Sequence, residues 1–390
     1  MIGVTSNLYE SKEYSDIREV IKDGINRYPD CVAFSIKNKE GKDIQYTDIT
    51  YAEFEKEINS LGTGLLKLGL KDKKIAIIGP NSYEWVLSYI SVLFGIGIVV
   101  PLDKGLPAQE IEDSIIRSDA DALIFDPKYI DIIEDIKQRS TTKVKEFICM
   151  KEVESKEINN IPKIKKIGKE ELDKGNKEFF ELKIEPEKTS IILFTSGTTS
   201  LSKAVMLSQK NIASNVHSMN AAEKLYNTDV NLVMLPFHHT FGSTGIILML
   251  NNGVRNVFCD GLRHIQENMK EYKVSVFVCV PLILEAMHKR ILLEVKKQGK
   301  EKTINRAKKL SNALLKVGVD VRKKLFKQLL DKLGGNMRFV VSGAAAIDKQ
   351  VAEDFNSWGI LTIQGYGLTE TSPVLCVKKC KSGMRKMKNV

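Results

Sequence analysis

Short apolar runs alternate with helical patterns along the first third of the chain. The runs Lys74–Gly79, Ile98–Leu102 and Ala122–Phe125 have the length and composition of buried strands. Apolar residues recur at helical spacing between them, as in Gln109–Ile116. Strand and helix patterns that alternate at this pitch predict βαβ units and a parallel sheet.

A hairpin and a capped helix are predicted before these units. Cys31–Ile36 has the pattern of a strand, and Ile44–Tyr46 that of its hairpin partner. Thr50 and Glu53 form a capping box at the start of an amphipathic helix. Residues 151–188 are rich in lysine and glutamate and poor in large apolar side chains, so we expect an exposed connection there.

The second half continues the same alternation. Strands are predicted at Ile191–Phe194, Val230–Leu235, Asn256–Cys259, Val274–Val280, Met337–Val341 and Leu361–Gln364. Helices are predicted at Gln209–Ala222 and over most of 282–330. The predicted fold class is α/β, with two packed parallel-sheet subdomains at 1–186 and 187–376. Residues 377–390 form a divergent basic tail in which we find no strand or helix periodicity.

The positive charge of the chain is concentrated in two places. The net charge is +10 over 390 residues. Residues 289–338 hold 16 Lys and Arg against 4 Asp and Glu, and 377–390 hold 6 basic residues and no acid. Local basicity argues against general nucleic-acid binding and for one or two positive faces. The basic helical stretch 289–338 fits either a contact with an anionic membrane surface or a solvated helix face.

Targeting signals and cysteine usage indicate a cytoplasmic protein. No basic start followed by an apolar segment indicates a signal peptide at the N-terminus. The longest apolar runs, such as Ile96–Leu102, are too short to span a bilayer. The six cysteines are scattered, and most lie in apolar runs, which suits buried thiols in a reducing compartment.

Three loops that follow predicted strands are rich in small residues. The first runs from Thr195 to Lys203, the second covers Ser342–Ala346, and the third covers Gly365–Pro373. Hydroxyls, free backbone N–H groups and a lysine can surround phosphate oxygens, although an ordinary Ser/Thr-rich surface loop has the same composition. Parallel strands bind ligands at their carboxyl ends, so three such loops together favour a nucleotide site.

Two side chains in the third loop suit nucleotide chemistry. Tyr366 lies between two glycines, where its ring could stack on a base or pack against a helix. Glu370 lies in a Thr-Glu-Thr turn, where it could hold Mg²⁺ beside ATP phosphates or act as a surface acid.

The motifs, taken together, resemble the adenylate-forming (AMP-binding) superfamily, and within it the long-chain fatty acyl-CoA synthetases. The first loop is similar to the family's Thr-Ser-Gly-Thr-Thr-Gly-x-Pro-Lys-Gly-Val, with Ser200, Ser202 and Ala204 at two glycine positions and a proline position. The third loop contains the family's Tyr-Gly-Leu-Thr-Glu. Leu235-Pro236-Phe237-His238-His239-Thr240-Phe241-Gly242 resembles Leu-Pro-Leu-x-His-x-x-Gly. The basic stretch 289–338 resembles an insertion of the long-chain branch.

The resemblance implies a role for each matched residue. It implies phosphate contacts for Thr195, Ser196, Gly197, Thr198, Thr199, Ser200 and Lys203. It implies adenine contacts for Ser342, Gly343, Ala344, Ala345 and Tyr366, and cofactor binding for Gln364, Gly365 and Gly367. Thr369 would meet the α-phosphate, Glu370 and Thr198 would bind Mg²⁺, and His239 would lie beside the carboxylate to be activated. Lys203, His239, Thr369 and Glu370 are therefore the predicted catalytic residues.

The implied activity is ATP-dependent conversion of a fatty acid to acyl-AMP and then to acyl-CoA, with ATP, Mg²⁺ and CoA. We find the resemblance from about Ser15 to Val374, and no match to the barrel and small C-terminal domain that follow in the family. The sequence thus predicts a truncated core with impaired thioester formation. Two alternatives stay open, namely an inactive nucleotide- or acyl-binding fragment, and an acyl-AMP ligase for another carboxylate. The predicted location is the cytoplasm, with peripheral contact at the inner membrane surface as an option.

Overall fold

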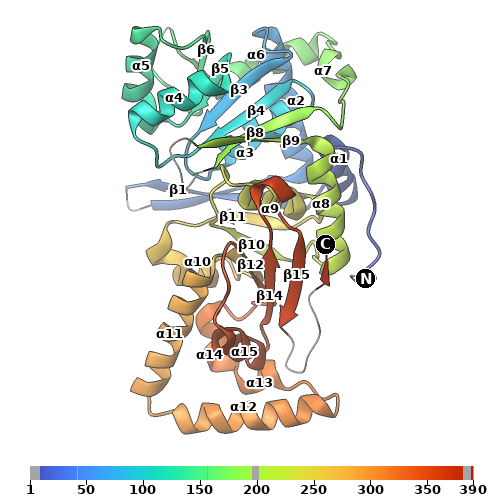
Figure 1. Cartoon of the computed structure of the whole chain (residues 1–390), viewed down its shortest axis with the longest axis vertical. Helices are drawn as coiled ribbons and strands as arrows, with labels where there is room; N and C mark the ends of the chain where they lie inside the picture. Colours follow the sequence, from blue (N-terminus) through green and yellow to red (C-terminus); the bar gives the residue numbers. More distant parts are fainter. Residues whose placement is uncertain (1–8, 42, 156, 196–201, 381–387, 390) are drawn as a thin grey trace.

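The computed structural model describes residues 9–41, 43–155, 157–195, 202–380 and 388–389. Its strands form a seven-stranded and a nine-stranded sheet, which lie one above the other in Figure 1. Helices flank both sheets, as predicted for an α/β fold. Both sheets are mixed rather than purely parallel, because antiparallel strands complete their edges.

The seven-stranded sheet has the order β7-β6-β5-β3-β4-β8-β9. Its strands are β3 (Lys73–Ile78), β4 (Gly97–Leu102), β5 (Ala122–Phe125), β6 (Glu146–Cys149), β7 (Asn159–Asn160), β8 (Thr189–Thr195) and β9 (Lys203–Ser208). All neighbours pair in parallel except β8 and β9. The helices of this part are α2 (Tyr51–Lys67), α3 (Tyr83–Leu93), α4 (Ala108–Ser118), α5 (Ile130–Arg139), α6 (Ile161–Asp173) and α7 (Glu178–Glu181).

The nine-stranded sheet has the order β16-β15-β14-β13-β12-β10-β11-β1-β2. Its strands are β1 (Val32–Glu40), β2 (Asp43–Thr50), β10 (Val230–Val233), β11 (Arg255–Phe258), β12 (Val276–Cys279), β13 (Phe339–Ser342), β14 (Leu361–Tyr366), β15 (Cys376–Cys380) and β16 (Lys388–Asn389). Strands β1 and β2 form the predicted hairpin. Both sheets therefore take strands from either side of residue 186, and the division into subdomains at that point stays a prediction.

The helices of the second half lie around and below the nine-stranded sheet in Figure 1. They are α8 (Gln209–Ala222), α9 (Thr240–Asn251), α10 (Ile265–Glu271), α11 (Pro281–Lys297), α12 (Glu301–Lys316), α13 (Arg322–Leu325), α14 (Lys327–Leu330) and α15 (Lys349–Ser357). The predicted helical stretch 282–330 is confirmed as α11 to α14. None of the helices within the described ranges is both long and apolar enough to cross a membrane.

One large core of apolar side chains joins the two sheets. It contains Phe34 of β1, Ile75 of β3, Leu93 of α3 and Ile247 of α9, all fully buried. Helix α3 is buried around almost its whole circumference, which explains why its sequence is apolar on nearly every side. Close packing of this kind fixes the position of one sheet relative to the other.

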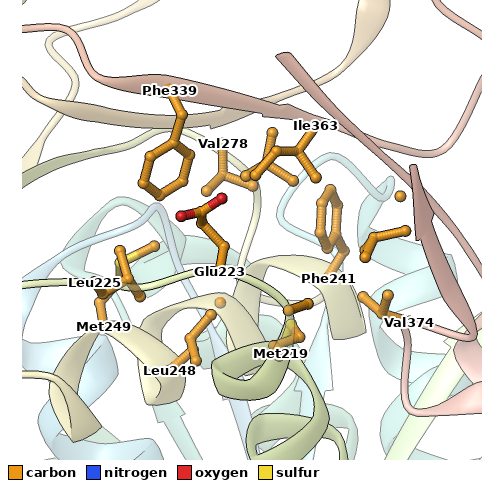
Figure 2. A pocket seen from close by; sticks show the side chains of 15 residues that line it. Met219, Glu223, Leu225, Phe241, Leu248, Met249, Val278, Phe339, Ile363 and Val374 are labelled. Atoms are coloured by element: carbon orange, nitrogen blue, oxygen red, sulfur yellow. The ribbon is translucent and has the colours of Figure 1, made fainter. Parts of the chain in front are cut away.

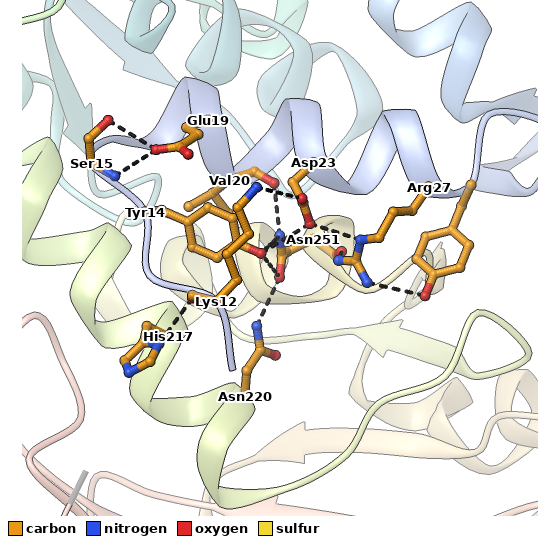
Figure 3. Close-up of polar contacts among 11 residues, drawn as sticks. Lys12, Tyr14, Ser15, Glu19, Val20, Asp23, Arg27, His217, Asn220 and Asn251 are labelled. Carbon is orange, nitrogen blue, oxygen red and sulfur yellow. Dashed lines mark hydrogen bonds and ion pairs between the residues drawn. The ribbon is translucent and has the colours of Figure 1, made fainter. Parts of the chain in front are cut away.

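A polar network fastens the first helix, α1 (Ile17–Arg27), to the end of α9 (Figure 3). The Asn251 side chain donates to the Val20 carbonyl oxygen over 2.9 Å and to the Tyr14 hydroxyl over 3.0 Å. Asn251 is fully buried, so losing either partner would leave an unsatisfied polar group. The N-terminal helix is therefore held by specific hydrogen bonds as well as by apolar contacts.

Two expectations were wrong. The segment 151–188 is not only an exposed connection, because it contains α6 and α7. Ile161 and Ile164 of α6 are buried, and this helix packs along α2. The low content of apolar residues misled the prediction, since isoleucines at helical spacing are enough for one buried face.

The second correction concerns the tail. Residues 376–380 form strand β15, which pairs antiparallel with β14, and residues 388–389 form β16. Lysines dominate this segment, yet Cys376 and Val377 are buried against the core. The strand is short and combines two buried residues with lysines, so its sequence shows no clear alternation and carries a weak signal.

Candidate active site

A cleft of about 490 Å³ opens at the carboxyl ends of the central strands of the nine-stranded sheet. Its walls come from the loops that follow β10, β12, β13 and β14. Of the predicted site residues, those that line it are His239, Gly343, Ala344, Gly365, Tyr366, Gly367 and Thr369. The topology thus gathers residues that are more than a hundred positions apart in sequence, as expected for the carboxyl edge of such a sheet.

The loop after β13 approaches the cleft with strained backbone. Ala344 has φ +69°, a left-handed conformation that is costly for a residue with a Cβ. A Cβ on the neighbouring Gly343 would lie 2.8 Å from the Phe241 ring, so this position has room only for glycine. Ser342 is fully buried at the end of β13 and pairs with Gln364 of β14. Ser342, Ala345 and Gln364 do not line the cleft.

The loop after β14 presents an exposed aromatic ring. Tyr366 keeps 56% of its surface exposed at the mouth of the cleft, so the alternative of a buried packing residue is excluded. A Cβ on Gly367 would lie 1.7 Å from the Pro373 carbonyl oxygen. The chain therefore folds back on itself at Gly367 and places the ring of Tyr366 and the side chain of Thr369 on one side of the cleft.

His239 precedes α9 and lines the cleft. Burial lowers its pKa, and the carboxylate of Asp103 acts in the opposite direction. A lowered pKa leaves the imidazole neutral at physiological pH, able to donate from one ring nitrogen and to accept at the other. Such a ring can orient a carboxylate without adding a formal charge.

Lys203 begins β9 and pairs with Thr195 of β8. Neither residue lines the cleft, but the turn Thr369–Thr371 packs against β9 and brings Glu370 to the lysine-bearing strand. Ala204 has a negative φ within the β8–β9 ladder, so its Cβ causes no strain there. The predicted residues Ser196, Gly197, Thr198, Thr199 and Ser200 lie outside the described residues.

Glu370 fits the predicted role of a magnesium ligand. Its side chain is exposed, and within the described part of the chain it has no hydrogen-bond or ion-pair partner. The same part contains no group of three His, Cys, Asp or Glu side chains that could hold a metal. Mg²⁺ in nucleotide sites is commonly held by one or two carboxylates and by the substrate phosphates, so a single free carboxylate suits it.

A second, apolar pocket of about 60 Å³ adjoins the cleft. Phe241, Gly365 and Val374 line both cavities. Figure 2 shows apolar side chains from α8, α9 and the nine-stranded sheet around this pocket, with the carboxylate of Glu223 among them. The sequence motif drew attention to His239, whereas Phe241, two residues further on, forms the wall between the two cavities.

Sequence reasoning also missed residues that support the site from the seven-stranded sheet. Arg117 of α4 donates from Nη1 to the Ser202 hydroxyl over 2.8 Å, and its guanidinium lies over the ring of Phe194. Arg117 thereby fixes the start of β9, next to Lys203. No local motif marks this arginine, because the contact joins positions that are distant in sequence.

Comparisons with known proteins place the chain in a family and show which solved structures share its fold. The chain is 28% identical over 385 residues to long-chain-fatty-acid–CoA ligase 5 of Rattus norvegicus. This match covers 93% of this chain and 56% of the relative. The chain spans about half the length of the curated relatives it matches. The fold is similar to that of a long-chain-fatty-acid–CoA ligase from Archaeoglobus fulgidus, with a TM-score of 0.72, 18% identity, and coverage of 97% of this chain and 68% of the other.

A further solved structure with this fold is the inhibitor-bound N-terminal domain of FACL13 from Mycobacterium tuberculosis. It has a TM-score of 0.68 and 18% identity, and the match covers 93% of this chain and 78% of that domain. The family model described as "AMP-binding enzyme" matches residues 21–389. The match corrects the expectation that the resemblance stops at Val374, since it includes β15. The chain therefore belongs to the family of AMP-binding enzymes.

Proposed function

We propose that this chain activates a fatty acid with ATP, forming an acyl-AMP in the cleft and releasing pyrophosphate. The observation that carries the proposal is the juxtaposition of His239 with Tyr366 and Thr369 in one cleft that adjoins an apolar pocket. A nucleotide, a carboxylate and an apolar tail are the three parts of an acyl adenylate, and each has a matching surface here.

The reaction is an in-line displacement at the α-phosphorus of ATP. A carboxylate oxygen forms the new P–O bond, the bond to the bridging oxygen breaks, and pyrophosphate leaves with its electron pair. Tyr366 flanks the adenine, Thr369 meets the α-phosphate, and neutral His239 orients the attacking carboxylate. Lys203 neutralises charge on the departing phosphates. Mg²⁺, held by Glu370, would supply further neutralisation of the phosphate charges. Positioning and charge neutralisation account for most catalysis in reactions of this kind.

The first few methylene groups of the acyl tail would enter the apolar pocket past Phe241, since its volume of about 60 Å³ is too small for a whole long chain. Apolar side chains of Leu248, Met249 and Val278 would remove these methylene groups from water, which stabilises the complex by about 0.8 kcal/mol for each buried CH₂. A long-chain fatty acid is the substrate class we propose. Transfer of the acyl group to CoA would be the second step, and it is the step that the sequence predicts to be impaired in this chain.

ATP–pyrophosphate exchange tests the proposed half-reaction. Labelled pyrophosphate should enter ATP when the full chain is supplied with Mg²⁺ and palmitate, and the rate should fall to background without palmitate. No exchange with palmitate, but exchange with another carboxylic acid, would point to another substrate. Nucleotide binding without any exchange would favour the alternative of an inactive binding protein.

We propose in addition that α11 and α12 contact an anionic membrane surface. Exposed leucines and valines lie among the lysines there, with Leu293 50%, Leu310 52% and Val317 74% exposed. Interleaved basic and apolar side chains on a helix surface suit an anionic interface. The full chain should sediment with vesicles containing phosphatidylglycerol, and not with pure phosphatidylcholine vesicles. Equal binding to both would contradict the electrostatic part of the proposal.

A further inference from the structure

The loop that carries His239 belongs to the nine-stranded sheet, but several of its contacts come from the other sheet. Residues 235–239 connect β10 to α9. Asn81, in the loop after β3, donates from Nδ2 to the Leu235 carbonyl oxygen over 2.7 Å. Its Oδ1 accepts from the Phe237 backbone N–H over 3.2 Å. One amide side chain thus binds the backbone on both sides of Pro236.

A second polar contact holds the next residue. His238 Nε2 lies 3.2 Å from Oδ1 of Asp103, which directly follows β4. Burial, and after it the neighbouring His239, lowers the pKa of His238 to about 4, while Asp103 opposes the shift and Lys104 adds to it. His238 is therefore neutral at physiological pH, and its Nε2–H donates to the carboxylate.

An aromatic contact also holds the loop that carries His239. Phe237 is buried with its ring centroid 5.0 Å from that of Trp85, in α3. The rings of His238 and His239 lie 4.3 Å apart, so a displacement of one ring moves the other. Every residue of the turn from Leu235 to His238, except Pro236, therefore has a partner in the half of the molecule built around the seven-stranded sheet.

We infer that Asn81 and Asp103 are positioning residues, which hold His239 at the angle needed to bind the substrate carboxylate. The inference rests on the proposed function. Asn81 fixes the backbone before His239, and Asp103 fixes the ring beside it. A misplacement of about 1 Å at a reacting group can cost about 10²-fold in rate, so contacts that restrict this loop contribute to activity without touching substrate.

Comparing the affinities of each variant for two ligands distinguishes a positioning role from a general effect on stability. The probes are 5′-O-(N-palmitoylsulfamoyl)adenosine, which mimics acyl-AMP, and AMP, which lacks the acyl carbonyl. Asn81→Ala and Asp103→Asn should each weaken binding of the mimic about tenfold and change AMP binding less than twofold. Asn160→Ala is the matched control, because Asn160 caps α6 through one backbone hydrogen bond far from the cleft. It should leave both affinities unchanged.

A double-mutant cycle gives a second measure. If Asn81 acts through His239, Asn81→Ala should weaken mimic binding less than twofold in a His239→Ala background. A tenfold effect in that background would overturn the inference. So would equal losses for the mimic and for AMP, because a merely structural role predicts them.

If wild-type protein does not bind the mimic, only the proposed function is overturned. The positioning role can still be tested by NMR of the His239 ring. The His239 ring should give one sharp set of resonances in wild-type protein and in Asn160→Ala. In Asn81→Ala those resonances should broaden or multiply, and the pKa should rise toward its ordinary value as the ring leaves its buried position. Unchanged resonances and pKa would overturn the positioning role.

Discussion

The two sheets of this protein divide the work of the site unequally. Among the described residues, those that line the cleft come from the nine-stranded sheet, through the loops after β10, β12, β13 and β14. The seven-stranded sheet supplies Lys203 at its edge, and otherwise Asn81, Asp103 and Arg117, which hold the loops of the site in place. The difference indicates that ligand contacts and the support of those contacts are encoded in different parts of the chain.

Backbone conformation shows the same contrast. On the seven-stranded side, Asp119 and Ser140 have positive φ as the C-caps of α4 and α5, where such conformations are common. On the nine-stranded side, Lys273 has positive φ between α10 and β12, and Ser372 has it as the C-cap of the turn Thr369–Thr371, while Ala344 has it in a loop that lines the cleft. Strain that surrounding structure maintains near a cleft is typical of functional sites.

The largest expected effect concerns Lys203, the side chain of the seven-stranded sheet to which we assign phosphate binding. Lys203→Ala should lower palmitate-dependent ATP–pyrophosphate exchange about 10²-fold, because a preorganised positive charge is lost where phosphate charge develops. Lys188→Ala is the control, since Lys188 pairs with Glu185 on the surface just before β8. An exchange rate that survives Lys203→Ala would contradict the phosphate-binding role assigned to this lysine.

Substitution of Gly367, which lines the cleft, should have an effect nearly as large on ligand binding. The Cβ of Gly367→Ala would meet the Pro373 carbonyl oxygen at 1.7 Å, so the loop bearing Tyr366 must move. We expect AMP binding, measured by isothermal titration calorimetry, to weaken at least about tenfold. Gly245→Ala in α9 has open space for its Cβ and serves as the control. Unimpaired AMP binding in Gly367→Ala would show that this loop does not contact the nucleotide.

The contact between His238 and Asp103 should make the free energy of unfolding depend on pH. His238 has a folded pKa of about 4 against an ordinary value of 6.5, so the unfolded chain binds more protons between these values. The stabilisation from this group is fully present above about pH 6.5 and is lost as the pH falls toward 4. By pH 5 the loss in the free energy of unfolding is about 2 kcal/mol.

Urea unfolding at pH 7 and pH 5 measures the effect. His238→Gln should lose less stability than wild-type protein over this interval, because glutamine does not titrate. The same pH dependence in both proteins would show that His238 is not buried in neutral form between the sheets.

The smallest effect tests the strain at Ala344. Ala344→Gly should raise the free energy of unfolding by up to about 1 kcal/mol, since glycine adopts positive φ without the Cβ penalty. Ala345→Gly, at a neighbouring position without positive φ, should instead lower it by about 0.5–1 kcal/mol. Equal losses in both variants would mean that the loop is not strained in solution.

The sequence predicted most elements of the fold, because its signals are local. The helix predicted at Gln209–Ala222 has the same bounds as α8, and the runs at Ile98–Leu102 and Ala122–Phe125 are strands β4 and β5. Capping by Thr50 and the apolar period made α2 equally clear. The failures, α6 and β15, are elements in which few apolar residues lie among lysines.

The residues of the candidate site also differ in whether local sequence signals reveal them. Residues in contiguous motifs, such as His239 and Tyr366, could be located from the sequence, and the structure places them in one cleft. Asn81 and Asp103 could not, because their importance lies in tertiary contacts with a loop about 130 to 160 residues away. A motif identifies groups that contact a ligand, whereas the residues that orient those groups become visible only in the folded chain.

The most direct test of this account is the affinity of the full chain for the acyl-adenylate mimic, measured by isothermal titration calorimetry against AMP and palmitate separately. The cleft and the apolar pocket share a wall, so the mimic should bind at least about 10²-fold more tightly than either fragment, because one molecule then occupies both cavities without a second loss of translational freedom. If the mimic binds no more tightly than AMP, the two cavities do not form one site, and the proposed activation of a fatty acid in this cleft is contradicted.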